Sequence, residues 1–275
     1  MKTIMRRILL PFLAGLLLGC GPGEVASVVV NRNAVPVMKK PVDFRAGGEM
    51  VTEVLLGEPV RILDKNGQWL HVSLRWQKDK QPGANEFGEY RGWIRADSGS
   101  IVTNQWREYP GGDWYVLVGT TDGHGFATVF LDEQCRRAVT RSIGIVLPAA
   151  RRQPAAPSLL ALRTPDGSLM YASRNAVVAW GSLQENDFRE AVAVHASKLV
   201  GKPYVWGGNS GPGVDCSGLV YLAARCAGRL VPRDTFPQYE VFAKIGRQDL
   251  AVGDLVYYQT YAAGASHVSM MVPGQ

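Results

Sequence analysis

The spacing of hydrophobic positions changes along the chain and divides it into regions. Up to about residue 180, apolar and polar residues alternate in short runs such as EPVRIL, QWLHVSL and YRGWIRA. Such runs are typical of β-strands, and the stretches between them, DKNG and QKDKQPGANEFGE, are rich in turn-forming residues. From residue 181, apolar residues recur three and four positions apart, which predicts helices. We therefore expect an α+β protein in which small β-domains precede a mixed region.

The expected domain boundaries follow these runs. Residues 34–103 predict a small β-barrel, and residues 104–180 predict a second small β-domain with the runs WYVLVG, FATVFL, SIGIVLP, SLLALRT and SLMYAS. The segment RRQPAAP inside it is also typical of a linker. Residues 181–275 form the third region, whose first predicted helix carries His195 on its apolar face, so we interpret His195 as a core histidine whose polar atoms are satisfied. His71 and His124 lie in the β region without a partner motif.

The first residues have the pattern of an export signal. Lys2, Arg6 and Arg7 precede an apolar run that ends at Cys20 and is too short to span a bilayer. The tetrapeptide LLGC resembles the bacterial lipobox, so we expect residues 1–19 to be a lipoprotein signal peptide and Cys20 to carry lipid. A plain signal peptide with an incidental cysteine is the alternative. Residues 20–33 are then a tether or a first strand, and the protein is expected in the cell envelope, anchored to the outer membrane if the host has two membranes.

The charge of the chain argues against nucleic acid as a partner. The formal net charge is +6, and loss of the three cationic residues of the leader lowers it by three, to +3. No basic run with interleaved aromatic residues is present. No set of histidines, cysteines and carboxylates has zinc-like spacing either, so we expect no metal and no cofactor.

Cys216 and Cys226 lie on one predicted helix in different settings. Apolar residues recur from Cys216 at helical spacing, and the helix is closed by Gly228. Cys216 falls in the first turn, where the helix dipole and free N–H groups favour a thiolate. It is thus a candidate nucleophile, although a small buried residue is the other interpretation. Cys226 is expected in the core. Cys135 is the remaining thiol, and three thiols leave at least one unpaired.

A nucleophilic thiol needs a base, and His267 is the best candidate. It opens the run SHVSMMV after the strand-like GDLVYY and the loop TYAAGA, which together predict a β-hairpin. If the hairpin packs on the Cys216 helix, thiol and imidazole meet. The alternative is a partly exposed strand histidine.

The motifs PYVWGG, DCSGLV, PRDTFPQ, VGDLVYY and SHV, in this order, resemble the NlpC-type family of papain-like cell-wall peptidases. The order LLGEPVRIL, GQWLHV and YRGWI resembles a bacterial SH3-like domain. The resemblance implies a papain-like domain behind one or two SH3-like barrels, with Cys216 as nucleophile and His267 as general base and acid. It also implies that Tyr204 and the Cys216 N–H bind the oxyanion.

Some relatives with SH3-like domains cut γ-D-glutamyl-diamino acid bonds in stem peptides with a free amino-terminal L-alanine. By position, Asp215 and Ser217 would bind that ammonium, and Arg233, Asp234 and Thr235 would line the pocket. Asp215 can instead be a helix N-cap, and Asp234 can simply pair with Arg233.

In such relatives the SH3-like domain also closes the pocket with an acidic residue and a tyrosine. Glu53 and Tyr90 are the positional candidates here.

The family places a further polar residue, often histidine, about a dozen positions after the catalytic histidine, to orient its ring. The chain stops at Gln275, so we expect this residue and the closing strands beyond it, in a longer reading frame; a degenerate enzyme is the alternative.

Two functions from different classes remain. The first is a cysteine endopeptidase acting on peptidoglycan peptides, and the second is a non-catalytic envelope lipoprotein that binds wall peptides through its SH3-like modules. An acyltransferase on the same scaffold would want an apolar lipid groove, and the PRDTFPQ motif argues against it.

Overall fold

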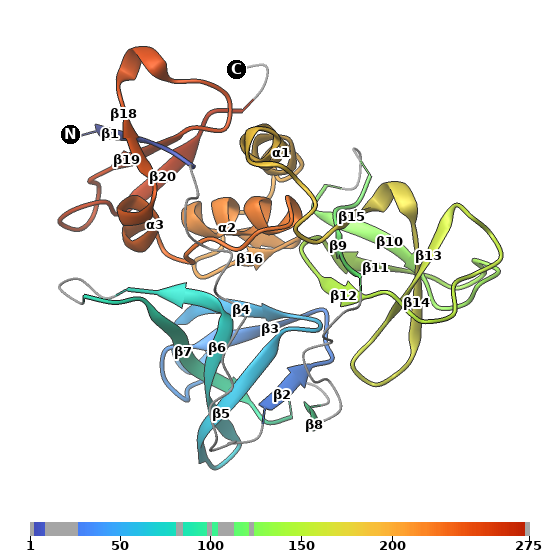
Figure 1. Ribbon diagram of the computed structural model, residues 1–275. Helices are drawn as coiled ribbons and strands as arrows, with labels where there is room; N and C mark the ends of the chain where they lie inside the picture. Colours follow the sequence, from blue (N-terminus) through green and yellow to red (C-terminus); the bar gives the residue numbers. More distant parts are fainter. Residues whose placement is uncertain are drawn as a thin grey trace.

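The computed structural model describes residues 3–8, 27–80, 85–97, 101–103, 113–120 and 124–272. In these residues three units pack around helix α2, which lies at the centre of the molecule (Figure 1). A β-barrel and a second β-domain contact α2 from one side, and a sheet of the third unit contacts it from the other. The architecture is α+β, as the sequence predicts.

The first β-domain is a seven-stranded antiparallel sheet in the order β4-β3-β7-β6-β5-β2-β8. Its strands are β2 (Ser27–Val30), β3 (Ala34–Met38), β4 (Met50–Leu55), β5 (Pro59–Asn66), β6 (Trp69–Asp79), β7 (Gly88–Arg95) and β8 (Ile101–Thr103), with a 3₁₀ helix at Phe44–Ala46. Alternate residues point inward, and their apolar side chains form a separate core. The three sequence-predicted strands are confirmed, and β6 extends into the stretch expected to be a turn.

Strand β2 falls inside the segment expected to be a tether. Val28 and Val29 pair with Val60 and Pro59 of β5, and Val29 is buried. The β-branched run SVVV favours this pairing because such residues pack well on a pleated surface. Of the two expectations for residues 20–33, a tether or a first strand, the strand is correct for Ser27–Val30. The barrel therefore begins before residue 34.

The second β-domain consists of two antiparallel sheets, in the orders β11-β10-β14-β13 and β12-β9-β15. The strands are β9 (Trp114–Leu117), β10 (Phe126–Phe130), β11 (Ala138–Ser142), β12 (Val146–Pro148), β13 (Leu159–Arg163), β14 (Leu169–Ser173) and β15 (Val177–Ala179), with a 3₁₀ helix at Arg174–Ala176. RRQPAAP joins β12 to β13 within the domain, and the Gln153 side chain bonds to the backbone of Ala161, so the segment is not an interdomain linker.

The third unit contains three helices, a two-stranded sheet formed by β16 and β17, and a four-stranded sheet that combines β18, β19 and β20 with a strand from the start of the chain. The helices are α1 (Glu185–Ser197), α2 (Cys216–Cys226) and α3 (Thr235–Val241); the strands are β16 (Asn209–Ser210), β17 (Gly213–Val214), β18 (Ala243–Ile245), β19 (Leu255–Tyr258) and β20 (His267–Met270), with a 3₁₀ helix at Arg247–Asp249. The expected hairpin is confirmed as β19–β20, in which Tyr258 pairs with His267. Helices α1 and α2 share an apolar core with this sheet.

Strand β1 (Thr3–Arg7) lies in this sheet between β18 and β19 and is antiparallel to both. The Arg7 guanidinium donates two hydrogen bonds of 3.0 Å to the carboxylate of Asp254. The sequence does not predict this strand, because its charges read as the start of a leader. The apolar part of the leader and Cys20 lie outside the described residues, so the signal peptide and the lipid remain predictions. Cleavage before Cys20 would remove β1 from this sheet.

His195 lies in the core, as predicted, with 7% of its surface exposed. Burial, and then the nearby Lys198 charge, lower the pKa of His195 to about 4. The expectation that its polar atoms are satisfied is wrong for Nδ1, which has no hydrogen-bond partner in the described part of the chain. Within the same residues, none of the helices is long and apolar enough to cross a bilayer.

Candidate active site

Cys216 is the first residue of α2 and is half-buried. Asp215 caps the helix, and its Oδ1 accepts a hydrogen bond of 2.6 Å from the backbone N–H of Gly218. Gly218 has no room for a side chain, because a Cβ there would collide with the Gly208 carbonyl oxygen. The thiol Sγ lies 3.6 Å from the Thr235 hydroxyl at the start of α3. The start of α2 therefore presents the thiol at the end of the helix where backbone N–H groups gather, as the sequence predicts, and Asp215 caps the Gly218 N–H.

Tyr204 lies beside this thiol. Its ring is 58% exposed, and its backbone bridges to Val214, just before α2. Partial burial, then the charge of Cys216 and a hydrogen bond with it, raise the pKa of Tyr204 above the usual range; a hydrogen bond from the Cys216 backbone N–H opposes this. The phenol and the Cys216 N–H thus lie in contact beside the thiol, and both are donor groups of the kind that binds an oxyanion.

His267 begins β20, which packs against α2. Val268, the next residue, shares a core with Val220, and Cys216 packs against the same cluster. The imidazole ring centroid lies 6.0 Å from that of Tyr258. Within the residues that the structure describes, no hydrogen bond or ion pair fixes this imidazole. The fold thus brings thiol and imidazole to neighbouring elements, and a ring-orienting residue beyond Gln275 stays a prediction.

Asp215 and Arg233 form a buried ion pair, which corrects the expectation that Asp215 and Ser217 bind the substrate ammonium. The two Arg233 Nη atoms donate to the two Asp215 carboxylate oxygens at 3.0 and 2.9 Å. Asp215 also accepts from the N–H groups of Gly207 and Gly218 and from the Ser217 hydroxyl. A carboxylate has about four acceptor sites, so these five donors leave none for a ligand.

Arg233 and Ser217 are also closed to substrate, with 0% and 4% of their surface exposed. The expectation that Arg233 lines the pocket is therefore wrong. The N-cap interpretation of Asp215 holds, and these three residues are the scaffold that fixes the start of α2.

Asp234, the residue after Arg233, contacts the barrel. Its side chain is 40% exposed, and its Oδ2 accepts a hydrogen bond of 3.0 Å from the Tyr90 hydroxyl of the barrel. Desolvation raises the pKa of Asp234 to about 6, and the Arg233 charge opposes this. Water reaching the exposed part screens some of the effect. The barrel tyrosine predicted by position is therefore in contact with the loop residue predicted to line the pocket.

Glu53 of strand β4 contacts β16 of the third unit. Its Oε2 accepts a hydrogen bond of 2.9 Å from the Asn209 N–H. Desolvation raises the pKa of Glu53, while that hydrogen bond and the nearby Arg233 charge oppose the rise. Close approach is possible because Gly207 has φ +75° and a Cβ there would lie 2.7 Å from the Met50 carbonyl oxygen. The barrel thus contributes a carboxylate and a phenol at the seam with the third unit.

Two features of the site are absent from the sequence predictions. Trp206 and Tyr261, from loops far apart in the chain, are 50% and 64% exposed and stack edge to face with centroids 5.9 Å apart. The second feature is a buried pair between Arg225 of α2 and Glu58 of the barrel. The signal for the Arg225–Glu58 pair was a charged residue in the otherwise apolar run LVYLAARC. The sequence contains no signal that places Trp206 next to Tyr261.

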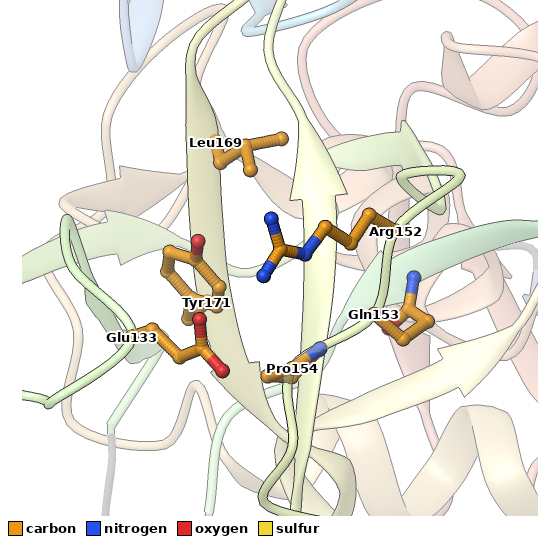
Figure 2. A pocket seen from close by; sticks show the side chains of 6 residues that line it. All are labelled: Glu133, Arg152, Gln153, Pro154, Leu169 and Tyr171. Atoms are coloured by element: carbon orange, nitrogen blue, oxygen red, sulfur yellow. The ribbon is translucent and has the colours of Figure 1, made fainter.

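A cavity of about 140 Å³ lies elsewhere, in the second β-domain (Figure 2). It is lined by Glu133, Arg152, Gln153, Pro154, Leu169 and Tyr171, and the Arg152 side chain reaches towards the two β14 residues, Leu169 and Tyr171. None of the predicted site residues lines it. No cysteine or histidine lines this cavity, and it is not part of the thiol site.

Two parts of the chain match known families. Residues 201–275 match the NlpC/P60 family, and residues 44–77 match the bacterial dipeptidyl-peptidase SH3 domain. The first match contains Cys216, His267 and the scaffold around them. The carboxy-terminal part of the chain is therefore similar to an NlpC/P60 domain, and part of the first β-domain is similar to a bacterial SH3 domain.

Individual relatives match the whole chain or part of it. A γ-D-glutamyl-L-lysine dipeptidyl-peptidase of Bacillus cereus is 26% identical over 231 residues, which are 82% of this chain and 65% of the relative. The bifunctional muramidase/DL-endopeptidase CwlT of Bacillus subtilis is 42% identical over 89 residues, 31% of this chain and 27% of the relative. The chain thus spans about two thirds of the first relative's length and about a quarter of the second's.

A solved structure of an NlpC/P60 family protein from Bacillus cereus has the same fold. It superposes with a TM-score of 0.69 at 21% identity and covers 90% of this chain and 88% of that one.

Proposed function

We propose that the protein is a cysteine peptidase of the bacterial cell wall, which hydrolyses amide bonds in peptidoglycan stem peptides. The observation that carries this is the thiol of Cys216 at the capped start of α2, with Tyr204 and Thr235 beside it and the strand of His267 packed on the same helix. The match of this segment to NlpC/P60, and relatives named as peptidases of wall peptides, support the substrate class.

The residues suggest the following sequence of steps. His267 accepts the thiol proton, and the Cys216 sulfur attacks the amide carbonyl carbon. The carbonyl oxygen becomes an oxyanion, which the Cys216 N–H and the Tyr204 hydroxyl stabilise. The C–N bond breaks, the amine leaves with the proton from His267, and a thioester remains. Water, deprotonated by His267, then attacks the thioester, and the carboxylic acid and the thiol are released.

We further propose that the bond cleaved is a γ-D-glutamyl-diamino acid bond in peptides with a free amino terminus. Glu53 and Asp234 place two carboxylates at the seam between barrel and NlpC/P60 domain, and Tyr90 orients the second. A substrate ammonium suits such a seam because it compensates carboxylates that burial destabilises. A binding site closed on one side by the barrel would favour the end of a substrate peptide over an internal segment of it. This agrees with the name of the Bacillus cereus relative, a dipeptidyl-peptidase.

The test is cleavage of muropeptides, followed by mass spectrometry. We expect the tripeptide L-Ala-γ-D-Glu-L-Lys to release L-Lys and its N-acetylated form to be cut far more slowly. Cys216→Ala should abolish release, whereas Cys135→Ser, a change at a thiol of the second β-domain, should leave it intact. Release by Cys216→Ala, or no new amine from any muropeptide, would refute the enzyme. Equal cleavage of the free and acetylated peptides would refute only the requirement for a free amino terminus.

Lipid anchoring in the cell envelope is also our proposal, and its support is the sequence pattern that ends at Cys20. The full-length protein, expressed in a bacterial host fed labelled palmitate, should carry the label, and Cys20→Ser should not. Equal labelling of the two proteins would exclude Cys20 as the anchor.

A further inference from the structure

Thr52 lies on the barrel strand β4 and has 0% exposed surface. Its hydroxyl donates a hydrogen bond of 2.6 Å to Gln77 Oε1. The same oxygen accepts from Arg233 Nε at 3.0 Å and from Asn209 Nδ2 at 3.3 Å. A hydroxyl offers one donor and two acceptor sites, so all of its capacity is used. Both acceptor sites bind residues of the NlpC/P60 domain.

Arg233, the first of these partners, has a contact for each of its five N–H donors. Nε donates to Thr52, Nη1 to Asp215 and Ser217, and Nη2 to Asp215 and the Gly208 carbonyl. Thr52 is the contact that the barrel supplies, and the other four contacts are with Asp215, Ser217 and Gly208. Because the fork is rigid, the direction of Nε also sets the direction of the two Nη atoms that hold Asp215.

Arg233 in turn controls the surroundings of Cys216 by two routes. Asp215, which it holds with two parallel hydrogen bonds, is the N-cap of the helix that Cys216 begins. Thr235, two residues after Arg233, contacts the Cys216 sulfur at 3.6 Å. A shift of the guanidinium would therefore move both the helix cap and the hydroxyl beside the thiol.

We propose that Thr52 is a positioning residue for the nucleophile: through Arg233, this barrel hydroxyl fixes the cap of α2 and thus the place and reactivity of the Cys216 thiol. The barrel then has a second role besides the carboxylate and phenol it offers to substrate. The activity readout of this inference rests on the proposed function, but the reactivity of the thiol itself does not.

The test compares Thr52→Val with Thr52→Ser in the full chain. Valine has nearly the shape of threonine and lacks the hydroxyl, whereas serine retains it. Ser73→Ala is the matched control: Ser73 is also 0% exposed in the barrel, and its hydroxyl bonds to Glu89, outside the network around Arg233. Three quantities are measured for each variant: the melting temperature, the rate of Cys216 alkylation by iodoacetamide as a function of pH, and kcat and KM on the tripeptide.

We expect Thr52→Val to move the alkylation profile of Cys216 to higher pH, because a loosened cap weakens the helix-start effect on the thiolate. It should also lower kcat on the order of tenfold or more, since a small displacement of a reacting group is costly. Thr52→Ser should restore both, and Ser73→Ala should lose stability without changing either. If Thr52→Val does not fold, Thr52→Ala, which leaves space for a water molecule, is measured instead.

An alkylation profile of Thr52→Val that superposes on the wild type would overturn the inference, and so would failure of serine to restore it. Effects of Ser73→Ala as large as those of Thr52→Val would show general destabilisation and overturn it as well. If the wild type cleaves no peptide, the proposed function fails, while the alkylation profiles still decide the role of Thr52.

Discussion

We expect His195 to make the folded protein sensitive to mild acid. Its imidazole is buried in α1, and its Nδ1 has no partner in the described residues, so the folded state resists protonation. The pKa is lowered from 6.5 to about 4. Because the folded pKa lies below the unfolded one, the unfolded chain binds the proton first. Stability is therefore complete above the unfolded pKa and is lost as the pH falls from there towards the folded pKa.

The size of the effect follows from these two pKa values. At about pH 5, nearly all unfolded chains and about a tenth of folded ones carry the proton, which corresponds to a loss of about 2 kcal/mol in unfolding free energy relative to about pH 7.5. A loss of that size is a sizeable share of the stability of a typical domain, about 5–15 kcal/mol.

The assay is urea unfolding of the wild type and His195→Leu at these two pH values, followed by far-UV circular dichroism. The difference between the proteins should grow by about 2 kcal/mol in favour of the leucine variant on going to the lower pH. Carboxylates such as Asp234 titrate in both proteins and cancel in this comparison. Parallel pH dependences for the two proteins would show that His195 is protonated in the folded state and would refute the reasoning.

Three further predictions concern the barrel and the thiols. Glu58→Gln leaves the Arg225 guanidinium buried without its counter-charge and should cost about 3–5 kcal/mol in urea unfolding, most of which Glu58→Leu combined with Arg225→Met should recover; a loss under about 1 kcal/mol would contradict this. Burial raises the pKa of Cys226 to about 12, so iodoacetamide at about pH 8 should label Cys216 well before Cys226 in peptide mapping, and equal rates would be the contrary result. Tyr90→Phe should raise KM for the free tripeptide on the order of tenfold with kcat nearly unchanged, because the Asp234 carboxylate loses its orienting hydroxyl; a fall in kcat alone would contradict this role.

The elements that the sequence predicts well are those with a local pattern. The helix of Cys216, the hairpin of His267 and three barrel strands follow from the period of their apolar residues and from turn residues between them. Cys226 has 0% exposed surface, as its place on the apolar stripe predicts.

The contacts between distant segments could not be predicted in this way. The sequence around Asp215 fits a ligand for ammonium as well as a helix cap. The outcome depends on Arg233, which binds Asp215 and is itself bonded to Thr52 on another domain. The position of strand β1 likewise depends on β18 and β19, which lie more than 200 positions away in the chain and pair with it on either side. Periodicity carries no information about such partners, because it reports which face is buried and not what covers it.

The buried Arg225 side chain restricts how the three units can be exchanged in evolution or in engineering. The Arg225 side chain extends from α2, forms an ion pair with Glu58 of the barrel, and donates a hydrogen bond to the Gly144 carbonyl of the second β-domain. A barrel grafted from another protein would have to bring an acid at the place of Glu58, and the second β-domain would have to offer a carbonyl at the same point. The domains of this protein are therefore expected to have been inherited together, as one catalytic unit, rather than recombined as independent modules.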